Sequence, residues 1–395
     1  MPLLNKIKNL FNTKIGRLSL ITLISSLAFA FNDVVWALYL DRFLQGTARV
    51  GFFSALLTII SFFSYFLLVP YIERNGKTKT YLRSLIFFVF IYALFSINTN
   101  FYVFVILAFG AAIAETLRVT SRGVIVKDNS HKKSLSKNQG IHLTFENLAW
   151  LIGPVIAGIV AAKYGINLVY LLSALFLLLS VITFKLSEIK NMEVKEKTNV
   201  NMVKNFFNFF KDKDRIIAYI FGGVVGLWSS LIYIYMPLYI VRSGLGLEWI
   251  GYLAAAVTIH LVLFEYFFGK LAGKIGFKNI FRLGFLTIAL FCMLSFLLTD
   301  IYLILLALSF TGIGIAMLEP TTEAYFFDIL DKKESLSFYG PYNTTSVVNK
   351  FIGRFSSAIV LLFLPFKFIF ILFAIFMFIL FTITFKMRDV IEDEK

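Results

Sequence analysis

The stretches LYLDRFLQG, residues 38–46, and LYIVRSGLG, residues 238–246, lie 200 positions apart and align without a gap. Further matches at the same offset are Gly51 with Gly251, Gly76 with Gly276, Lys132-Lys133 with Lys332-Lys333, and Gly140 with Gly340. Hydrophobic helices resemble one another by chance, but matching loop residues do not arise from hydrophobicity alone. The chain is therefore predicted to contain two copies of one structural unit.

The composition is that of a membrane protein. Of the 395 residues, 59% are hydrophobic and 15% are charged, and 47 are phenylalanine, which excludes a water-soluble globular protein. A helix needs about 20 apolar residues to cross the hydrocarbon of a bilayer, and the chain divides into twelve runs of that kind. The predicted spans are 18–44, 48–72, 81–98, 101–126, 141–162, 168–186, 216–242, 248–272, 280–298, 301–326, 341–364 and 366–386.

The lysines and arginines predict the orientation of these spans. Of the 38, only five fall in loops on one side: Arg42, Arg49, Lys163, Arg242 and Lys367. Positive residues collect on the cytoplasmic side, so we expect a multi-pass protein of the cell membrane with both termini in the cytoplasm. This asymmetry and the attraction to anionic lipid explain the net charge of +15, so no nucleic-acid partner is expected.

The sequence divides into two halves joined by a polar segment. Residues 187–214 are too polar to span, and the second part of this segment has the apolar and basic mixture of a helix lying on the membrane surface. We therefore expect an N-terminal bundle at 1–186, a cytoplasmic linker at 187–214 and a C-terminal bundle at 215–395. The expected fold is an all-α polytopic membrane protein with twelve transmembrane helices in two parallel six-helix bundles.

The loop after span 2 resembles a family signature. The stretch VPYIERNGK, residues 69–77, follows the pattern G-x-x-x-D-R-x-G-R/K through Glu73, Arg74, Gly76 and Lys77, although valine occupies the first glycine position. This pattern is the signature of the major facilitator superfamily. The resemblance implies the fold of that family and a loop that acts as a conformational switch.

The equivalent loop of the second half carries the complementary part of the signature. The stretch GKLAGKIGFK, residues 269–278, keeps Gly269, Lys274 and Gly276, but Gly273 stands in place of the acid. Glycine permits tight turns and close approach of helices. We expect both loops to act as conformational-switch loops.

Span 5 contains a second resemblance, to the G-P-x-x-G-G motif of antiporters, especially drug/proton exporters. Gly153, Pro154 and Gly158 match it, with alanine at position 157. Proline bends a helix and small residues allow close packing. Gly-Pro pairs also occur in other kinds of family member, so the motif favours export and leaves uptake open.

Charged and polar residues inside the membrane mark the candidate site. Asn32, Asp33 and Trp36 lie in span 1, and Glu115 and Arg118 lie one helical turn apart in span 4. An ionisable group in hydrocarbon is costly and seldom idle. The family resemblance implies that spans 1, 4, 7 and 10 line the transport cavity, so we expect these residues on the proton-coupling and substrate path. Alternatively, the charged groups pair with one another and only hold the two spans together.

The second half carries a further set of charges. Glu319 and Glu323 share one face of span 10, and Lys350 and Arg354 share one face of span 11. We expect them to form gate ion pairs on the cytoplasmic side or permanent structural pairs.

These features predict a secondary active transporter, with proton-coupled export of amphipathic small molecules by alternating access. The alternative is an uptake transporter or facilitator for a sugar, organic anion or metabolite. We expect no enzyme activity, catalytic residue, metal site or cofactor, because the sequence has no nucleophile-base pair, metal-ligand cluster or Walker pattern. The expected partners are the substrate, protons and the lipid bilayer, and the expected state is a monomer.

Overall fold

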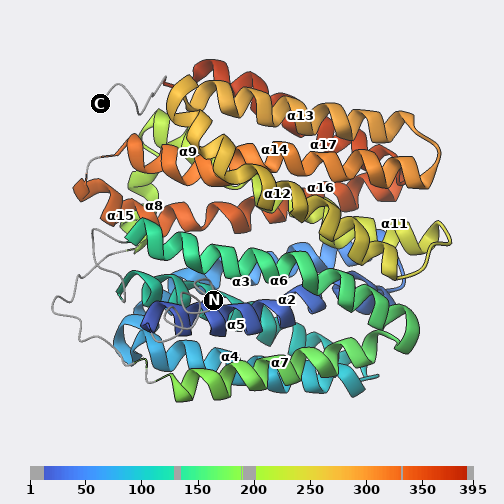
Figure 1. The fold of residues 1–395 in the computed structure, drawn as a ribbon. Helices are drawn as coiled ribbons and strands as arrows, with labels where there is room; N and C mark the ends of the chain where they lie inside the picture. The colour runs from blue at the N-terminus through green and yellow to red at the C-terminus, as the bar shows by residue number, and fades with distance from the viewer. Residues whose placement is uncertain (1–12, 129–134, 188, 190–201, 331, 389–395) are drawn as a thin grey trace, which may run out of the picture. The chain divides into compact units, whose positions relative to one another are not determined.

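The computed structural model describes residues 13–128, 135–187, 189, 202–330 and 332–388, and every regular element in these ranges is a helix (Figure 1). Within these ranges, twelve helical spans are long and apolar enough to cross a membrane. The predicted all-α fold with twelve spans is therefore confirmed. The predicted spans and the helices coincide apart from several residues at their ends.

The first six spans are single helices: α2 (Lys14–Leu44), α3 (Thr47–Asn75), α4 (Lys77–Ile97), α5 (Phe101–Asp128), α6 (Leu135–Tyr164) and α7 (Ile166–Leu186). A short helix, α8 (Met202–Phe209), precedes the second set. That set comprises α9 (Lys213–Gly222), α10 (Val224–Ser230), the π-helix η2 (Leu231–Tyr235), α11 (Met236–Arg242), α12 (Glu248–Ile275), α13 (Phe277–Leu297), α14 (Ile301–Asp328), α15 (Lys332–Asn343), α16 (Thr345–Phe363), α17 (Phe368–Ile383) and the 3₁₀ helix η3 (Thr384–Lys386).

The 200-residue repeat of the sequence is visible in the helix boundaries. Helices α4 and α13 cover 77–97 and 277–297, and α5 and α14 cover 101–128 and 301–328. The turns that precede α4 and α13 are also alike, because Gly76 has φ 84° and Gly276 has φ 82°. Residues other than glycine are strained at such positive φ values. The two glycines thus make the same helix-to-helix turn in both halves.

We expect Gly76→Val or Gly276→Val to slow the exchange between conformations while leaving substrate affinity nearly unchanged. A β-branched residue at positive φ adds strain of at least about 1–2 kcal/mol to the turn. The control is Gly123→Val, because a side chain there meets nothing within 4 Å and the backbone φ is not positive. The measurements are substrate counterflow rate and equilibrium binding. A loss of affinity at an unaltered exchange rate would place these glycines in the substrate site instead.

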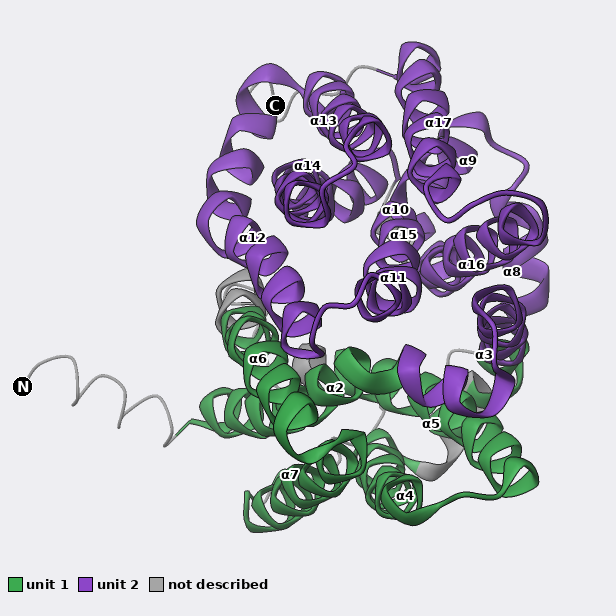
Figure 2. Cartoon of the chain, turned by 90° about the vertical axis from the view of Figure 1, so that its right-hand side faces the viewer, with its two compact units in different colours: residues 1–36, 63–197 green, residues 37–62, 198–395 purple. Residues whose placement is uncertain are grey.

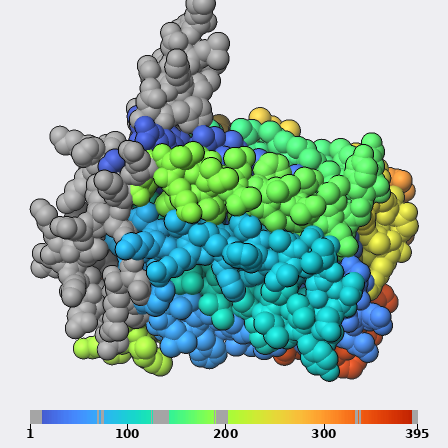
Figure 3. Space-filling view, turned by 90° about the horizontal axis from the view of Figure 1, so that it is seen from below, coloured from blue at the N-terminus to red at the C-terminus, as the bar shows by residue number. Residues whose placement is uncertain are grey.

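The first compact unit comprises residues 1–36 and 63–197, shown in green in Figure 2. Helix α4 packs against both α5 and α7, and Figure 3 shows the surface of α7 directly beside that of α4. Aromatic rings fill the space between these helices, with 5.9 Å between the ring centroids of Tyr92 and Tyr170 and 5.3 Å between those of Phe95 and Tyr170. These buried rings fix α4 against α7.

The span-5 glycine lies where α6 approaches α2. A Cβ atom added at Gly153 would lie 2.9 Å from the Cβ of Ala30, which is closer than two such atoms come. Pro154, inside α6, and Gly158 are also buried. The small residues of the predicted antiporter motif therefore serve helix packing within this unit.

We expect Gly153→Ala to destabilise the first unit by about 1–3 kcal/mol, because overpacking forces neighbouring backbone apart. Adding Ala30→Gly should recover part of this loss, since it removes the methyl group that the new side chain meets. The measurement is the midpoint of thermal unfolding in detergent. A double variant no more stable than Gly153→Ala would contradict the assigned contact.

The second compact unit comprises residues 37–62 and 198–395, shown in purple in Figure 2. It therefore includes the end of α2 and the beginning of α3, which the sequence division at 186 assigns to the first bundle. Within this unit, span 7 and α16 approach very closely. A Cβ at Gly353 would lie 3.0 Å from the Leu227 carbonyl oxygen, and one at Gly226 would meet the Ser346 carbonyl. Glycines thus permit backbone contact between these two spans.

Span 7 is irregular. It changes from α10 through the π-helix η2 to α11, whose second residue is Pro237. Insertions of this type widen one helical turn and redirect the side chains that follow. The hydroxyl of Tyr235, at the end of η2, donates to the backbone carbonyl of Arg354 in α16.

The linker contains helix α8, at the position where a surface helix is predicted. Met202 and Phe209 are buried, whereas Val203 and Phe207 are exposed. The Asn205 amide donates to the Ser337 carbonyl of α15 at 3.1 Å. Residues 188 and 190–201 of the predicted linker lie outside the described residues.

Candidate functional site

Asn32 and Asp33 lie in the long α2 helix, and both are half-buried. The amide nitrogen of Asn32 donates to a carboxylate oxygen of Asp33 at 3.0 Å. Trp36 lies one turn further along, and its ring centroid is 5.8 Å from that of Phe95 in α4. The three predicted residues of span 1 therefore occupy one partly accessible part of the helix.

Glu115 and Arg118 form a bidentate ion pair on α5. The Nε and Nη2 atoms of Arg118 donate to the two carboxylate oxygens of Glu115 at 2.8 and 2.6 Å. The Arg118 guanidinium also lies 3.9 Å from the centroid of the Phe29 ring of α2. The arginine side chain is 8% exposed and the glutamate side chain 43% exposed. The positive charge of Arg118 is thus buried, whereas the carboxylate of Glu115 remains accessible from outside the protein.

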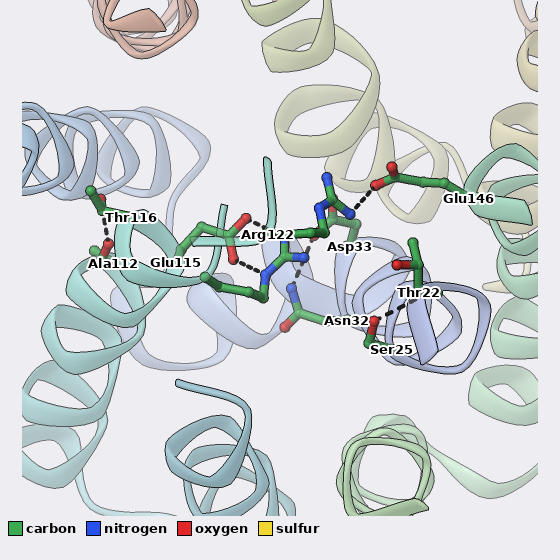
Figure 4. A network of polar contacts seen from close by, with 10 residues as sticks. Thr22, Ser25, Asn32, Asp33, Ala112, Glu115, Thr116, Arg122 and Glu146 are labelled. Atoms are coloured by element: carbon green, nitrogen blue, oxygen red, sulfur yellow. Dashed lines mark hydrogen bonds and ion pairs between the residues drawn. The ribbon is translucent and has the colours of Figure 1, made fainter. Parts of the chain in front are cut away.

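Two polar atoms of this site have no hydrogen-bond partner among the described residues. They are the Nη1 donor of Arg118 and the Oδ1 acceptor of Asn32, and both atoms are buried. Buried polar atoms are nearly always satisfied in folded proteins by protein, water or ligand. In Figure 4 the side chains of Asn32, Asp33 and Glu115 point into the same region. The site therefore offers one donor and one acceptor beside two carboxylates.

A second ion pair connects α5 with α6. The Nη1 atom of Arg122 donates to a carboxylate oxygen of Glu146 at 2.6 Å, and both side chains are largely buried (Figure 4). His142, one turn before Glu146, lies near the edge of hydrogen-bond range from the Thr22 hydroxyl, at 3.4 Å. The two residues of this pair are 24 positions apart on different helices, so their pairing does not follow from sequence spacing.

The predicted gate residues of the second half lie on α14 and α16. Glu319 is exposed, and Glu323 accepts a hydrogen bond from the Tyr339 hydroxyl at 2.9 Å. The Nη1 atom of Arg354 donates to the backbone carbonyl of Ser54 at 3.1 Å. Lys350 is half-buried, and its backbone carbonyl accepts from the Ser230 hydroxyl at 3.3 Å. Ion pairing among the four charged residues as a gate stays a prediction.

The predicted switch residues lie at the ends of α3 and α12. Gly269 and Lys274 belong to the last turns of α12, where the Lys274 side chain is exposed, and Lys77 begins α4. Glu73 and Arg74 lie in the last turn of α3, and their side chains lie outside the described part of the structure. The switching role of both loops stays a prediction.

The structure adds a contact that sequence reasoning missed, at the turn between α2 and α3. Asp41 accepts hydrogen bonds from the Nη2 atom of Arg242 at 3.0 and 3.2 Å and from the backbone amide of Gly46 at 2.9 Å. We call these three residues the Asp41 clasp. It ties the end of α2 to the end of α11 within the second unit. The repeat provided a signal, because Asp41 and Arg242 lie in the two stretches that align at an offset of 200 residues.

Comparison with known proteins identifies the family of this arrangement. A family model described as Major Facilitator Superfamily matches residues 18–262 and 250–395. An uncharacterized MFS-type transporter of Methanocaldococcus jannaschii is 26% identical over 57% of this chain and 59% of its own length. Multidrug resistance protein 2 of Bacillus subtilis is 21% identical over 70% of each chain. A solved POT family transporter in complex with 5-aminolevulinic acid superposes with a TM-score of 0.77 at 14% identity, covering 94% of this chain and 95% of its own. The chain thus belongs to the major facilitator superfamily of membrane transporters.

Proposed function

We propose that this transporter exports amphipathic, cationic small molecules in exchange for protons. The observation that supports this most strongly is the pair of partly accessible carboxylates, Asp33 and Glu115, of which Glu115 pairs with the buried guanidinium of Arg118. Two carboxylates and one arginine leave one negative charge, which a cationic substrate neutralises. Protonation of one carboxylate removes that attraction.

The change in the charge of the site on protonation of a carboxylate supplies a mechanism for coupling proton and substrate transport. With Asp33 ionised, a cation binds; with Asp33 protonated, the site has no excess charge and the cation leaves. A carboxylate whose surroundings change between two conformations can take up a proton on one side and release it on the other. Glu115 shares the excess charge, and Arg118 limits how much of it Glu115 carries.

Two further features favour an exporter of amphipathic molecules. Trp36 lies one helical turn from Asp33, is half-buried and packs against the buried ring of Phe95, and an aromatic ring of this kind binds cations and apolar groups. The matched relative from Bacillus subtilis is named for multidrug resistance, and the packing motif of α6 resembles that of drug/proton antiporters.

One observation favours a second candidate, uptake of a solute that carries a carboxylate. The unpartnered Nη1 donor of Arg118 is suited to bind a carboxylate oxygen. In this alternative, the proton and the solute travel in the same direction. The two candidates predict opposite responses to one pH gradient.

The charge distribution of the loops also favours one location and one orientation of the transporter. We propose a monomer in the cell membrane with both termini and helix α8 in the cytoplasm, since the basic loops lie on that side of the predicted spans. The Asp41 clasp then lies at the opposite end of the spans. The loops at Gly76 and Gly276 and the charges on α14 and α16 would act on the cytoplasmic side.

The experiment is flux of ethidium, a permanently charged cation, into proteoliposomes held at zero membrane potential. A permanent charge prevents trapping by protonation in an acidic lumen. Antiport predicts accumulation only when the lumen is the more acidic side. Accumulation only with acidic external buffer would indicate symport, and equilibration without accumulation would indicate a facilitator.

A further inference from the structure

A pocket lies in the second compact unit, at the end of the spans that carries the Asp41 clasp. Its volume is about 550 Å³, and it is lined by the turn into α3, the end of α11 and the residues that join α16 to α17. Part of the lining, which we call the polar wall, comprises Thr47, Arg49 and Arg242, and another part, the apolar wall, comprises Leu362, Leu364 and Phe366. The pocket therefore combines polar and basic lining residues from the turn into α3 and the end of α11 with apolar ones from the junction of α16 and α17.

The polar wall contains hydrogen-bond donors that have no partner among the described residues. Arg242 uses only Nη2 for Asp41, and its other nitrogens have no hydrogen-bond partner among the described residues. Arg49 donates once, from Nη1 to the Leu44 carbonyl at 3.3 Å. Thr47 is 6% exposed, and its hydroxyl has no partner in the described part of the chain. Donors of this kind suit a phosphate or carboxylate group.

The electrostatic balance of this wall also favours an anion. Two arginines face one carboxylate, that of Asp41, which leaves one positive charge. Thr47 is the first residue of α3, and the first amides of a helix have no acceptor within the helix. The positive end of the helix dipole therefore adds to the attraction.

The apolar wall indicates that the anion carries hydrocarbon. Leu362 is 57% exposed and Leu364 is 44% exposed. Phe366 is stacked on Tyr239, with 4.4 Å between the ring centroids, and so presents a fixed apolar surface. Since α16 ends at Phe363, these residues lie at the end of a membrane span, where headgroups meet hydrocarbon chains.

We propose that this pocket binds an anionic phospholipid, with the phosphate at Thr47, Arg49 and Arg242 and an acyl chain along Leu362, Leu364 and Phe366. Arginine donors and a helix N-terminus suit the phosphate of a headgroup, and exposed apolar residues at the end of a span suit the acyl chain attached to it. Arg242 also belongs to the Asp41 clasp, so a bound headgroup would share its guanidinium with Asp41, using the nitrogens that Asp41 leaves unbonded.

The test uses the full-length protein in detergent, titrated with short-chain phosphatidylglycerol, phosphatidylcholine or inorganic phosphate. Binding is followed by native mass spectrometry and by the midpoint of thermal unfolding. The variants are Arg49→Gln and Thr47→Val, and the matched control is Arg42→Gln, which removes an exposed charge at the same end of the spans without lining the pocket. We expect phosphatidylglycerol to bind best and Arg49→Gln to weaken it about fivefold or more.

Thr47→Val replaces the hydroxyl group with a methyl group of similar size and should also weaken binding, which keeps the test valid if Arg49→Gln fails to fold. Equal binding of phosphatidylcholine and phosphatidylglycerol would overturn the proposal. An equal loss in Arg42→Gln would also overturn it, because binding would then follow surface charge. Protection by inorganic phosphate as strong as that by the lipid would show an anion site without a lipid chain.

Discussion

Asp33→Asn should abolish the accumulation of a cationic substrate against its gradient while leaving a folded protein. The carboxylate is half-buried in α2 and accepts from the neighbouring Asn32 amide, and an asparagine keeps its shape without its titration. A gradient of one pH unit stores about 1.4 kcal/mol per proton, enough for roughly tenfold accumulation in one-to-one exchange. We expect that ratio to fall to about one in the variant.

The measurement is ethidium uptake into proteoliposomes with an acidic lumen, together with equilibrium binding of a neutral amphipathic compound. The control is Glu248→Gln, which removes a carboxylate from the first turn of α12 in the second unit. It should transport like the unaltered protein. Uphill transport by Asp33→Asn at the normal ratio would assign Asp33 a structural role only.

Glu115→Gln should destabilise the first unit by about 2–4 kcal/mol. The substitution leaves the guanidinium of Arg118 buried against Phe29 without its bidentate partner, and an unpaired buried charge is among the most damaging changes in a protein. The lower end of this range allows for the 43% exposure of the glutamate side chain. The measurement is thermal unfolding in detergent.

Removing both charges of the pair tests whether transport depends on the excess charge of the site. In the double variant Glu115→Gln with Arg118→Met, no charge remains to be paired, so most of the lost stability should return. The double variant keeps the one negative charge of Asp33, so proton-coupled transport of the cation should return together with the stability. A double variant that is stable but does not transport would contradict a mechanism that depends only on the excess charge of the site.

The positions of the helices and the 200-residue repeat could be predicted from the sequence. Apolar runs of sufficient length can only be spanning helices in a membrane, and the offset of 200 residues recurs in the bounds of α4 and α13 and in the glycine turns before them. The pairing of Glu115 with Arg118 follows from their spacing on one helix face.

Contacts between distant helices could not be predicted in the same way. Spans that are apolar on every side carry no strong periodic signal of which face meets which neighbour. The ion pair of Arg122 with Glu146 and the bond of Asp41 with Arg242 depend on the rotation of each helix about its axis. The π-helix of span 7 adds a local change of register that no composition rule reveals.

The sequence also did not predict that residues 37–62 belong to the second unit, because this too depends on contacts between distant helices. Gly51 packs against the Tyr235 hydroxyl and Ala358, and Arg354 binds the Ser54 carbonyl, so this segment contacts span 7 and α16 within the second unit. These contacts involve backbone and small residues, which sequence patterns describe poorly.

The most direct test of proton exchange is the proton movement that the substrate itself causes. Proteoliposomes with a pH-sensitive dye in the lumen are prepared at equal pH and zero membrane potential, and ethidium is added outside. Exchange through Asp33 predicts that the lumen becomes alkaline as the cation enters, and that the Asp33→Asn protein gives no change. Ethidium entry with a constant or increasingly acidic lumen in the unaltered protein would contradict proton-coupled export.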